Sequence, residues 1–255
     1  MNKHYCFTDL HGCYDLWRQI KNYCDETDTL YFLGDAIDRG PDGVVLMEEL
    51  LKDKRVIYLK GNHEHMAASC ISEYLHGDTE FLLFWFADGG RPTWDSLSLW
   101  SDDSLINLVK KLNNLPEYIN YTNTKGQKIF LSHAGMNIDK SKEEMKVIEK
   151  TELPYLWGRI HIFEDWNKTK EYENRYIIHG HSPVQWVSSV LGQTAKAEIL
   201  IYANGHKIDL DLNSVNSGKV ALFDLDEMKV EKYFYDRKFT LSMKGGIIWL
   251  YKKKK

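Results

Sequence analysis

The stretch Gly34-Asp35-Ala36-Ile37-Asp38-Arg39-Gly40 decides how the rest of the chain is interpreted. The apolar run Leu30–Leu33 before it is typical of a strand, and Gly34 ends that strand. Asp35 therefore lies at a strand's carboxyl end, where open α/β sheets bind their ligands. Two interpretations fit this stretch by itself. It could be a loop that binds metal and phosphate, or a charged turn in which Asp38 caps the loop and Arg39 is solvated.

The first strand of the chain also ends in polar side chains. We predict this strand at His4–Thr8, and Asp9-Leu10-His11-Gly12 comes directly after it. Residues i and i+2 of an extended backbone face the same way, so Asp9 and His11 could bind one ion. Such a pair is common by chance, and it gains meaning only together with other motifs. Apolar residues at helical spacing then predict a helix at Tyr14–Cys24.

A third strand ends in a similar way. The apolar segment Arg55–Leu59 is followed by Gly61-Asn62-His63-Glu64. The side-chain carbonyl of Asn62 is a hard donor suited to Mn²⁺ or Mg²⁺, and Asn is also a good N-cap for the helix predicted at Met66–Ile71. The two roles are compatible. Three strand–loop–helix units in this part of the chain predict an α/β sandwich with polar residues at the strand ends.

Two later strands lead into turns that contain histidine and glycine. A hairpin is predicted from Pro116–Tyr121 and Gln127–Leu131, and its second strand leads into Ser132-His133-Ala134-Gly135. The strand predicted at Tyr176–Ile178 leads into His179-Gly180-His181-Ser182-Pro183. Either His179 or His181 could be a ligand in that turn, with the other packed and hydrogen-bonded.

The remaining segments suggest one domain over residues 1–255. Residues 72–115 are rich in aromatic residues and are predicted to form a helical cap beside the cleft, with most of these aromatics in the core. Ser141–Lys150 is predicted to be a charged helix or loop. In residues 196–236 the alternation of apolar and polar residues predicts an antiparallel sheet with one solvated face.

The composition is that of an ordinary soluble globular chain. The 255 residues suffice for one large domain, with 43% hydrophobic and 27% charged residues and a net charge of −4. This balance gives no general attraction to nucleic acid or to an anionic membrane, and Lys252–Lys255 is expected to be a solvated tail. The four cysteines show no CxxC spacing, and no leader or membrane span is evident, so we expect a cytoplasmic protein.

The strand ends together supply enough donors for two metal ions. These donors are Asp9, His11, Asp35, Asn62, His133 and one of His179 and His181. Oxygen and imidazole donors without a thiolate favour Mn²⁺, Fe or Zn²⁺, and six ligands suit two ions that share one carboxylate. Two ions roughly 3.5–4 Å apart can hold a hydroxide and clamp a phosphoryl group for in-line attack. Arg39 and Arg159 could bind the phosphate, and His63 beside Asp38 is a candidate general acid.

Five short motifs follow one another between residues 9 and 183. They are Asp-x-His-Gly, Gly-Asp-x-x-Asp-Arg-Gly, Gly-Asn-His-Glu, His-Ala-Gly and Gly-His-Ser-Pro. In this order they resemble the phosphoprotein phosphatases, a family of calcineurin-like metallophosphoesterases, and most of all its bacterial and bacteriophage-type members. The resemblance implies an α/β fold, a β-sandwich of mixed sheets flanked by helices with a di-metal site at the carboxyl ends of strands. It implies Asp9 and His11 on one metal, Asp35 as the bridge, and Asn62, His133 and His181 on the second metal. It also implies Asp38 and His63 as an acid dyad, and Arg39, Asn62 and Arg159 as the phosphate site.

Two positions bear on how far the resemblance extends. Lys60 stands where many members of this family carry Arg. Lysine keeps the positive charge but lacks the bidentate fork of arginine, so phosphate affinity or substrate range could differ. Glu64 favours a protein phosphatase, because the similar dinucleoside polyphosphate hydrolases tend to carry Asp there.

These observations lead to a functional hypothesis with two alternatives. We expect a Mn²⁺-dependent phosphomonoesterase, with Fe, Zn²⁺, Ni²⁺ or Mg²⁺ as other possible ions. It would dephosphorylate phosphoserine and phosphothreonine, and conceivably phosphotyrosine, in proteins. The alternatives are a hydrolase of dinucleoside polyphosphates such as diadenosine tetraphosphate, and a non-catalytic binding protein. The expected partner is a phosphorylated protein or a small phosphoester, with no nucleic acid or membrane, and the chain is expected to be a monomer or a weak oligomer.

Overall fold

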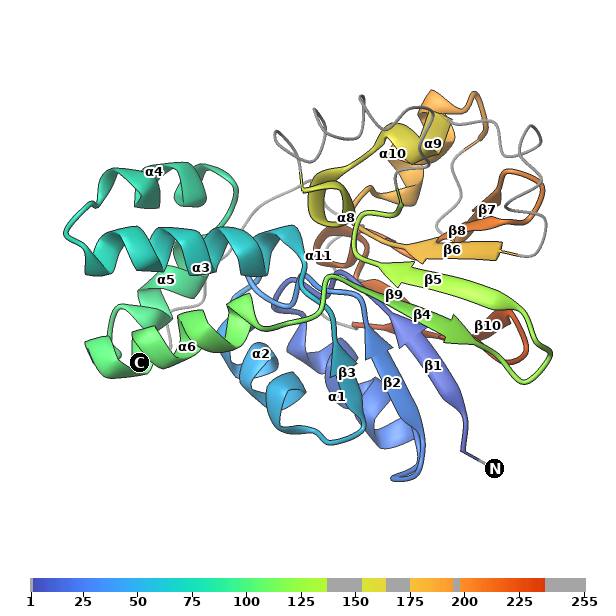
Figure 1. The fold of residues 1–255 in the computed structure, drawn as a ribbon, viewed down its shortest axis with the longest axis horizontal. Coiled ribbons are helices and arrows are strands. Elements are labelled where there is room, and N and C mark those ends of the chain that lie inside the picture. Colours follow the sequence, from blue (N-terminus) through green and yellow to red (C-terminus); the bar gives the residue numbers. More distant parts are fainter. Residues whose placement is uncertain (1, 137–152, 164–174, 195–197, 237–255) are drawn as a thin grey trace.

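Two five-stranded mixed sheets form the centre of the molecule (Figure 1). The computed structural model describes residues 2–136, 153–163, 175–194 and 198–236. The strand order is β10-β9-β1-β2-β3 in the first sheet and β4-β5-β6-β8-β7 in the second. Helices flank both sheets, so the predicted sandwich of mixed sheets is confirmed.

The first sheet is built around three parallel strands that the apolar segments predicted. These are β1 (His4–Phe7), β2 (Thr29–Phe32) and β3 (Val56–Tyr58). Parallel strands end at the same edge of a sheet, so the polar loops at their carboxyl ends meet there. Two antiparallel strands, β9 (Lys219–Asp224) and β10 (Lys229–Tyr235), complete the sheet beside β1.

The second sheet also has parallel strands at its centre. Strand β5 (Lys128–Ser132) pairs with β6 (Arg175–His179), and β6 pairs with β8 (Lys207–Asp209). The hairpin partner β4 (Tyr118–Thr122) and the short strand β7 (Leu200–Tyr202) are antiparallel edges. The parallel strands β5 and β6 thus bring the turns with His133 and His181 to one edge.

The C-terminal strands correct the prediction of one antiparallel sheet. The pairs β7–β8 and β9–β10 are each antiparallel, but they belong to different sheets. The chain crosses between them through the short helix α11 (Ser214–Ser217), which lies between two residues with left-handed backbone, Asn213 (φ 58°) and Gly218 (φ 61°). All six residues of β9 are buried, because a strand in the interior of a sheet that is covered on both faces has no solvated side.

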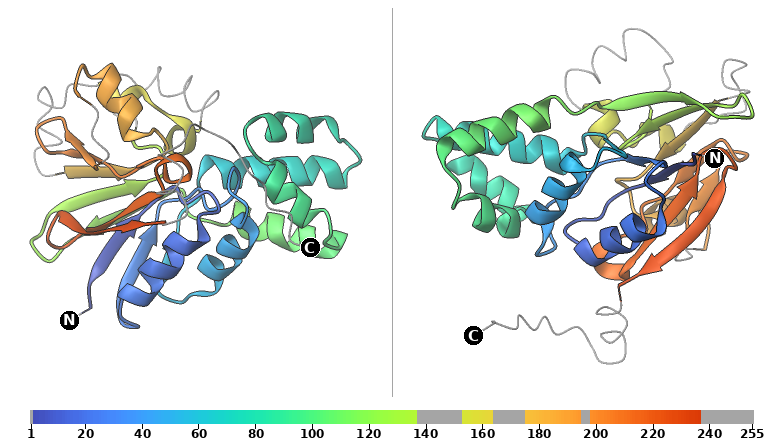
Figure 2. Two further views of the ribbon diagram at one scale, coloured as in Figure 1. Left: turned by 180° about the vertical axis from the view of Figure 1, so that it is seen from behind. Right: turned by 90° about the horizontal axis from the view of Figure 1, so that it is seen from below.

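The core follows the alternation of side chains along the strands. Tyr5 and Phe7 point to one face of the first sheet and pack with Leu16 of α1 (Tyr14–Tyr23) and Met47 of α2 (Gly43–Lys52). Cys6 points to the other face and belongs to the apolar layer between the two sheets. The further views show α1 and α2 against the outer face of the first sheet (Figure 2).

Four helices form a group beside the sheets (Figure 1). They are α3 (Asn62–Leu75), α4 (Glu80–Ala87), α5 (Arg91–Leu97) and α6 (Asp102–Asn113), so the region expected to form a cap is helical. Its aromatic residues divide between two environments. Trp85 is fully buried and Phe86, Trp94 and Trp100 pack against the core, whereas Phe81 and Phe84 are exposed, so the expectation that most of these aromatics lie in the core is confirmed.

Three short helices accompany the second sheet, namely α8 (Pro154–Trp157), α9 (Ile160–Phe163) and α10 (Val184–Val190). The predictions for Ser141–Lys150 and Lys252–Lys255 lie outside the described residues. Within the part of the chain that the structure describes, no helix has the length and apolar character needed to cross a membrane.

Candidate metal centre and acid dyad

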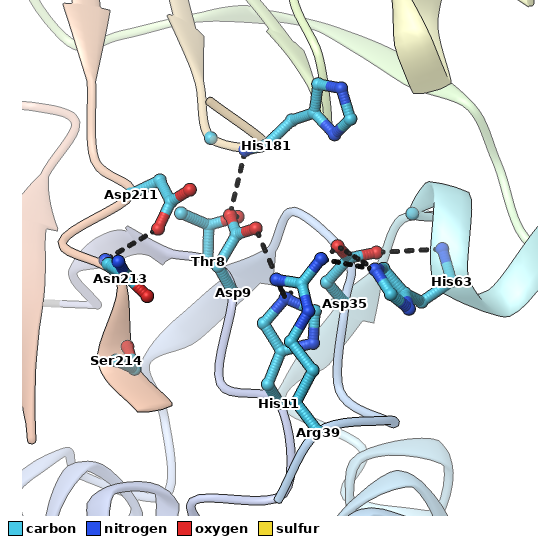
Figure 3. A network of polar contacts seen from close by, with 12 residues as sticks. Thr8, Asp9, His11, Asp35, Arg39, His63, His181, Asp211, Asn213 and Ser214 are labelled. Carbon is cyan, nitrogen blue, oxygen red and sulfur yellow. Dashed lines mark hydrogen bonds and ion pairs between the residues drawn. The ribbon is translucent and has the colours of Figure 1, made fainter. Parts of the chain in front are cut away.

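The backbone is strained where the predicted site residues lie. Within the described residues, ten non-glycine residues have positive φ, and six of them are candidate site residues: Asp9, His11, Asp35, Asp38, Arg39 and His181. A left-handed conformation is unfavourable for a residue with a side chain, and such strain concentrates at functional sites. The sharp turns at these strand ends direct the side chains toward one region (Figure 3).

Two loops hold each other in this conformation. The amide of His11 donates to the carbonyl of Asp35 (2.9 Å), and the amide of Gly12 donates to that of Ala36 (2.7 Å). The loops approach so closely that a Cβ on Gly40 would lie 2.2 Å from the carbonyl oxygen of His11. Glycine is therefore required there, and the first and second strand ends form one rigid unit.

Asp35 occupies the centre of the site. It belongs to two groups of potential metal ligands whose donor atoms lie within 4.8 Å of one another: one with His11 and His63, the other with His133 and His181. Its Oδ2 is 3.4 Å from Nε2 of His11 and 3.3 Å from Nε2 of His133. A single carboxylate between two sets of imidazoles is the arrangement expected of a bridging ligand.

Asn62 lies on the side of His133 and His181. Its Oδ1 is 2.7 Å from Nε2 of His133 and 2.9 Å from Nδ1 of His181. The N-cap of α3 is Gly61, and Asn62 is the first residue of the helix, so the alternative role of Asn62 as the cap is wrong. The amide oxygen instead points at two histidines that the resemblance places on the same metal.

The structure also separates the two histidines of the last motif. His181 joins Asp35 and His133, whereas His179 is buried with its Nε2 2.8 Å from the hydroxyl of Tyr202. His179 is therefore the packed and hydrogen-bonded member of the pair.

Asp9 is close to this centre but belongs to neither group of ligands. Its Oδ2 accepts hydrogen bonds from Oγ1 of Thr8 (2.5 Å) and from the amide of His181 (3.1 Å), and its Oδ1 is 4.0 Å from Nε2 of His11. His63, which the sequence suggested as the acid, is instead within the first group. The predicted ligands thus lie together, with Asp9 turned toward the strand end of His181.

Hydrogen bonds to the backbone fix the orientation of two imidazoles. Nδ1 of His11 is 2.8 Å from the carbonyl of Ile37, and Nδ1 of His133 is 2.9 Å from that of Leu33. Since a carbonyl only accepts, Nδ1 of each ring carries a proton. Nε2 of His11 accepts from Arg39 and so has a lone pair, whereas Nε2 of His133 faces the oxygens of Asn62 and Asp35 and carries a proton as well. Nε2 of His181 is buried and has no hydrogen-bond partner within the described residues.

The charges of these groups suit a divalent cation. Burial raises the pKa of Asp35, but the neighbouring His133 and His63 outweigh it and hold that pKa well below its usual range. Burial lowers the pKa of His11 and His181, so both imidazoles are neutral near pH 7. Burial acts in the same direction on His133, but the Asp35 carboxylate raises its pKa to about 9. Metal binding at His133 therefore requires loss of a proton.

The donor set fits a pair of hard or borderline metal ions. It combines carboxylate and amide oxygens with imidazole nitrogens and contains no thiolate, a combination that suits Mn²⁺, Fe or Zn²⁺. The unpartnered buried Nε2 of His181 is the kind of polar atom that a metal ion would satisfy.

The proposed acid dyad is present beside Asp35. Nδ1 of His63 is 2.6 Å from Oδ2 of Asp38, and both side chains are fully buried. Burial lowers the pKa of His63, but the carboxylates of Asp35 and Asp38 outweigh it and raise that pKa. A raised pKa favours the protonated form that a general acid needs.

Arg39 is exposed, and its guanidinium lies across the front of this group (Figure 3). Its Nη1 is 2.7 Å from Nε2 of His11 and its Nη2 is 2.8 Å from Nε2 of His63. A guanidinium only donates, so both nitrogens accept, and His63 is neutral in this arrangement. Protonation of His63 therefore requires Arg39 to leave this nitrogen.

Arg159 lies at the side of His181. Its Nε donates to Oγ of Ser182 (3.0 Å), and its guanidinium lies 5.6 Å from the ring centre of Trp186. The residue is largely exposed, and its charge contributes to the lowered pKa of His181. Arg159 is thus tied to the turn that carries a candidate ligand.

Glu64 and Lys60 support the site from behind. The carboxylate of Glu64 accepts hydrogen bonds from the amides of Asp35, Ala36 and Gly61 and from the hydroxyl of Tyr58. Glu64 therefore acts on the Asp35 loop. The amino group of Lys60 donates to the carbonyl of Asn113 at the end of α6 (2.9 Å), so its charge stabilises a helix terminus.

Sequence analysis missed three residues of the helical group. The indole nitrogen of Trp85 donates to Oδ2 of Asp38 (2.8 Å), and the amide of Asp38 donates to Oγ1 of Thr93 (2.9 Å). Oδ2 of Asp88 is 3.9 Å from Nε2 of His63. The sequence signal was the Gly89-Gly90 pair after an aromatic run, which by itself indicates only a break between helices.

Comparison with known proteins agrees with this geometry. The family model described as calcineurin-like phosphoesterase matches residues 3–211. Serine/threonine-protein phosphatase 2 of Escherichia coli (strain K12) is 28% identical over 222 residues, which cover 85% of this chain and 90% of that protein. The asymmetrical bis(5'-nucleosyl)-tetraphosphatase PrpE of Bacillus velezensis is 28% identical over 200 residues, with coverage of 70% and 76%.

A solved structure shows the same fold. The metallophosphoesterase from Sphaerobacter thermophilus superposes with a TM-score of 0.52 at 14% identity, covering 89% of this chain and 86% of that chain. The strand order, the cluster of ligands and the match of the family model over most of the sequence lead to one assignment. This chain belongs to the calcineurin-like phosphoesterase family.

Proposed function

We propose that this chain is a Mn²⁺-dependent phosphomonoesterase that dephosphorylates phosphoserine and phosphothreonine in proteins. The observation that supports this most strongly is the shared carboxylate of Asp35. It lies between two sets of imidazoles and next to the hydrogen-bonded pair of His63 and Asp38. A shared ligand and an acid on one side of it are the parts that hydrolysis of a phosphomonoester requires.

The chain's own residues would divide the work between two metal sites. Asp9, His11 and Asp35 would hold one metal ion, and Asp35, Asn62, His133 and His181 would hold the second. When bound, the two ions would supply Lewis acidity, which ionises water near neutral pH and offsets the charge of the phosphoryl oxygens. The rigid contact between the loops of His11 and Asp35 would keep the two sets of ligands in register.

The two arginines would bind the phosphate. The Arg39 guanidinium shares Nε2 of His11 with any metal ion bound there, so metal binding would release it to the phosphoryl oxygens. Arg159 could reach the phosphate from the His181 side. With Arg39 withdrawn, Nε2 of His63 would take up a proton and donate it to the leaving alkoxide, while Asp38 keeps the imidazole oriented.

Asp88 favours a substrate whose leaving group is uncharged. Its side chain is 47% exposed and lies 3.9 Å from Nε2 of His63, the atom that would protonate the leaving group. A serine or threonine alkoxide leaves as a neutral alcohol. The leaving group of a dinucleoside polyphosphate is itself a polyanion, which a carboxylate at this position repels. The phosphatase name of the E. coli relative points the same way.

A second candidate function is hydrolysis of dinucleoside polyphosphates. The similarity to the B. velezensis tetraphosphatase, over 70% of this chain, is the observation in its favour. This function would use the same metal ligands and the same arginines. It differs in the group attached to the phosphate, which is a nucleotide instead of a peptide.

One experiment separates these possibilities. The protein is stripped with a chelator and supplied with Mn²⁺, Mg²⁺, Zn²⁺ or Ni²⁺. Hydrolysis of phosphoserine, phosphothreonine and phosphotyrosine peptides is then measured beside diadenosine tetraphosphate. The proposal predicts that Mn²⁺ restores activity on phosphoserine or phosphothreonine peptides well above that on the dinucleotide. Preference for the dinucleotide would establish the second function, and inactivity on both classes with every ion would indicate a binding protein.

A further inference from the structure

The junction between α4 and α5 contacts the acid dyad directly. We name it the α4–α5 corner and define it as Trp85, Gly89, Gly90 and Thr93. Three hydrogen bonds join it to Asp38 and Arg39: from Trp85 Nε1 to Asp38 Oδ2 (2.8 Å), from the Asp38 amide to Thr93 Oγ1 (2.9 Å), and from the Arg39 amide to the Gly89 carbonyl (2.8 Å).

Trp85 and His63 bind the same oxygen of Asp38. His63 Nδ1 is 2.6 Å from Oδ2, Trp85 Nε1 is 2.8 Å from it, and Oδ1 has no partner within the described residues. The terminal torsion of an Asp side chain has broad energy minima, so a single hydrogen bond from His63 would leave the carboxylate free to turn. The second donor removes that freedom.

The position of Trp85 is itself fixed by packing. Its side chain is fully buried, and a Cβ on Gly90 would lie 2.1 Å from its Cδ1. Glycine at residue 90 therefore lets α5 begin directly against the indole. The ring of Trp94 lies 6.2 Å from that of Trp85, centre to centre, on the same helical group.

The corner also holds a strained backbone. Asp38 (φ 69°) and Arg39 (φ 64°) are both left-handed, and each donates its amide to the corner. Such residues persist only where the surroundings fix them. The helical group thus determines both the direction of the Asp38 carboxylate and the path of the chain that carries Arg39.

We propose that the α4–α5 corner is a positioning element for the acid step, with Trp85 as a positioning residue that orients Asp38 and, through it, His63. This inference rests on the acid role given to His63 in the proposed function. Trp85 need not touch the substrate. Its indole keeps Nε2 of His63 aimed at the leaving group during proton donation.

The test replaces Trp85 by Phe, which keeps an aromatic ring and removes the donor. Trp94→Phe is the matched control, because Trp94 contacts Trp85 but its indole is not bonded to Asp38. The Mn²⁺-loaded variants are assayed on phenyl phosphate and on p-nitrophenyl phosphate, whose leaving group needs less protonation. Mn²⁺ content and circular dichroism report on the fold and the metal ligands.

We expect Trp85→Phe to lower kcat on phenyl phosphate by about 10- to 100-fold, as misplacement of a catalytic group does, with KM nearly unchanged. The loss on p-nitrophenyl phosphate should be several-fold smaller, and Trp94→Phe should lose little on either substrate. In an Asp38→Ala background, Trp85→Phe should have almost no further effect, because the two changes remove one interaction. Equal losses on both phosphates, or additive losses in the double variant, would overturn the proposal.

A second pair of variants keeps the test decisive if Trp85→Phe does not fold. Thr93→Val removes the acceptor for the Asp38 amide with little change of shape, and Thr93→Ser restores it. We expect Val to reproduce the dependence on the leaving group and Ser to reverse it, and failure of Ser to do so would contradict the proposal. Activity on aryl phosphates without activity on phosphopeptides would refute the proposed function alone.

Discussion

Replacement of His63 by Asn removes one half of the acid dyad and leaves the other half in place. The amide nitrogen of Asn lies near the position of the imidazole Nδ1, so it can still donate to Oδ2 of Asp38, 2.6 Å away in the dyad. Nothing in Asn reaches the position of Nε2, which is 2.8 Å from Arg39. The variant therefore loses the proton donor without leaving the buried Asp38 carboxylate unpaired.

The size of the expected loss is that of losing a general acid. A general acid contributes about 10²–10⁴-fold to kcat, which corresponds to roughly 2.7–5.4 kcal/mol of barrier. We expect a loss in this range on a phosphoserine peptide, because an alkoxide is a poor leaving group. The loss on p-nitrophenyl phosphate should be much smaller, because that leaving group departs with little protonation.

Steady-state kinetics on the two substrates measure these losses, and the Mn²⁺ content of the variant shows whether the ligands are intact. His65→Asn is the matched control, since His65 lies in the same helix but is outside both groups of potential ligands within the described residues. Equal losses on both substrates would refute the acid role of His63. Loss of metal in proportion to activity would show that His63 acts as a ligand instead.

Three further predictions test other parts of the structure. Asp35→Asn should leave fewer than two Mn²⁺ ions per chain by elemental analysis and abolish hydrolysis, and a variant with two ions and full activity would contradict the bridging role. Asp88→Asn should raise the activity on diadenosine tetraphosphate relative to a phosphoserine peptide, and an unchanged ratio would remove the charge argument for substrate choice. Burial raises the pKa of Asp226, but hydrogen bonds from His4, Thr124 and Tyr121 outweigh it and hold that pKa below its usual value. The unfolded chain therefore takes up this proton first, and the stabilisation is complete at neutral pH and is lost as the pH falls through the pKa of the folded state. Because solvent screens part of these interactions, Asp226→Asn should lower the free energy of unfolding by only about 1 kcal/mol at pH 7 and by less near pH 3. Urea denaturation at the two pH values measures this difference. An equal effect at both pH values would show that the charge is not involved.

The local patterns of the sequence predicted the strands and the residues at their carboxyl ends. The alternation of side chains along Leu30–Leu33 has a period of two, and burial on both faces makes such a run apolar throughout. The run ends at Gly34, and Asp35 is the next residue. Asp35 must therefore lie at the end of the strand, wherever that strand is placed in the fold. The same logic places Asp9, Asn62, His133 and His181 at strand ends. Their meeting at one site results from the parallel order of the strands.

The tertiary structure alone decided which distant segments meet. Alternation along residues 196–236 predicts strands but carries no information about which neighbour each strand pairs with, so the division of these strands between two sheets was missed. The hydrogen bond from Lys60 to Asn113 joins residues 53 positions apart, and the hydrogen bond from Trp85 to Asp38 joins residues 47 positions apart. An indole buried for packing and an indole buried to orient a carboxylate have the same local sequence pattern. Only the path of the chain brings the partner to the ring, because long-range contacts depend on how whole helices and sheets pack.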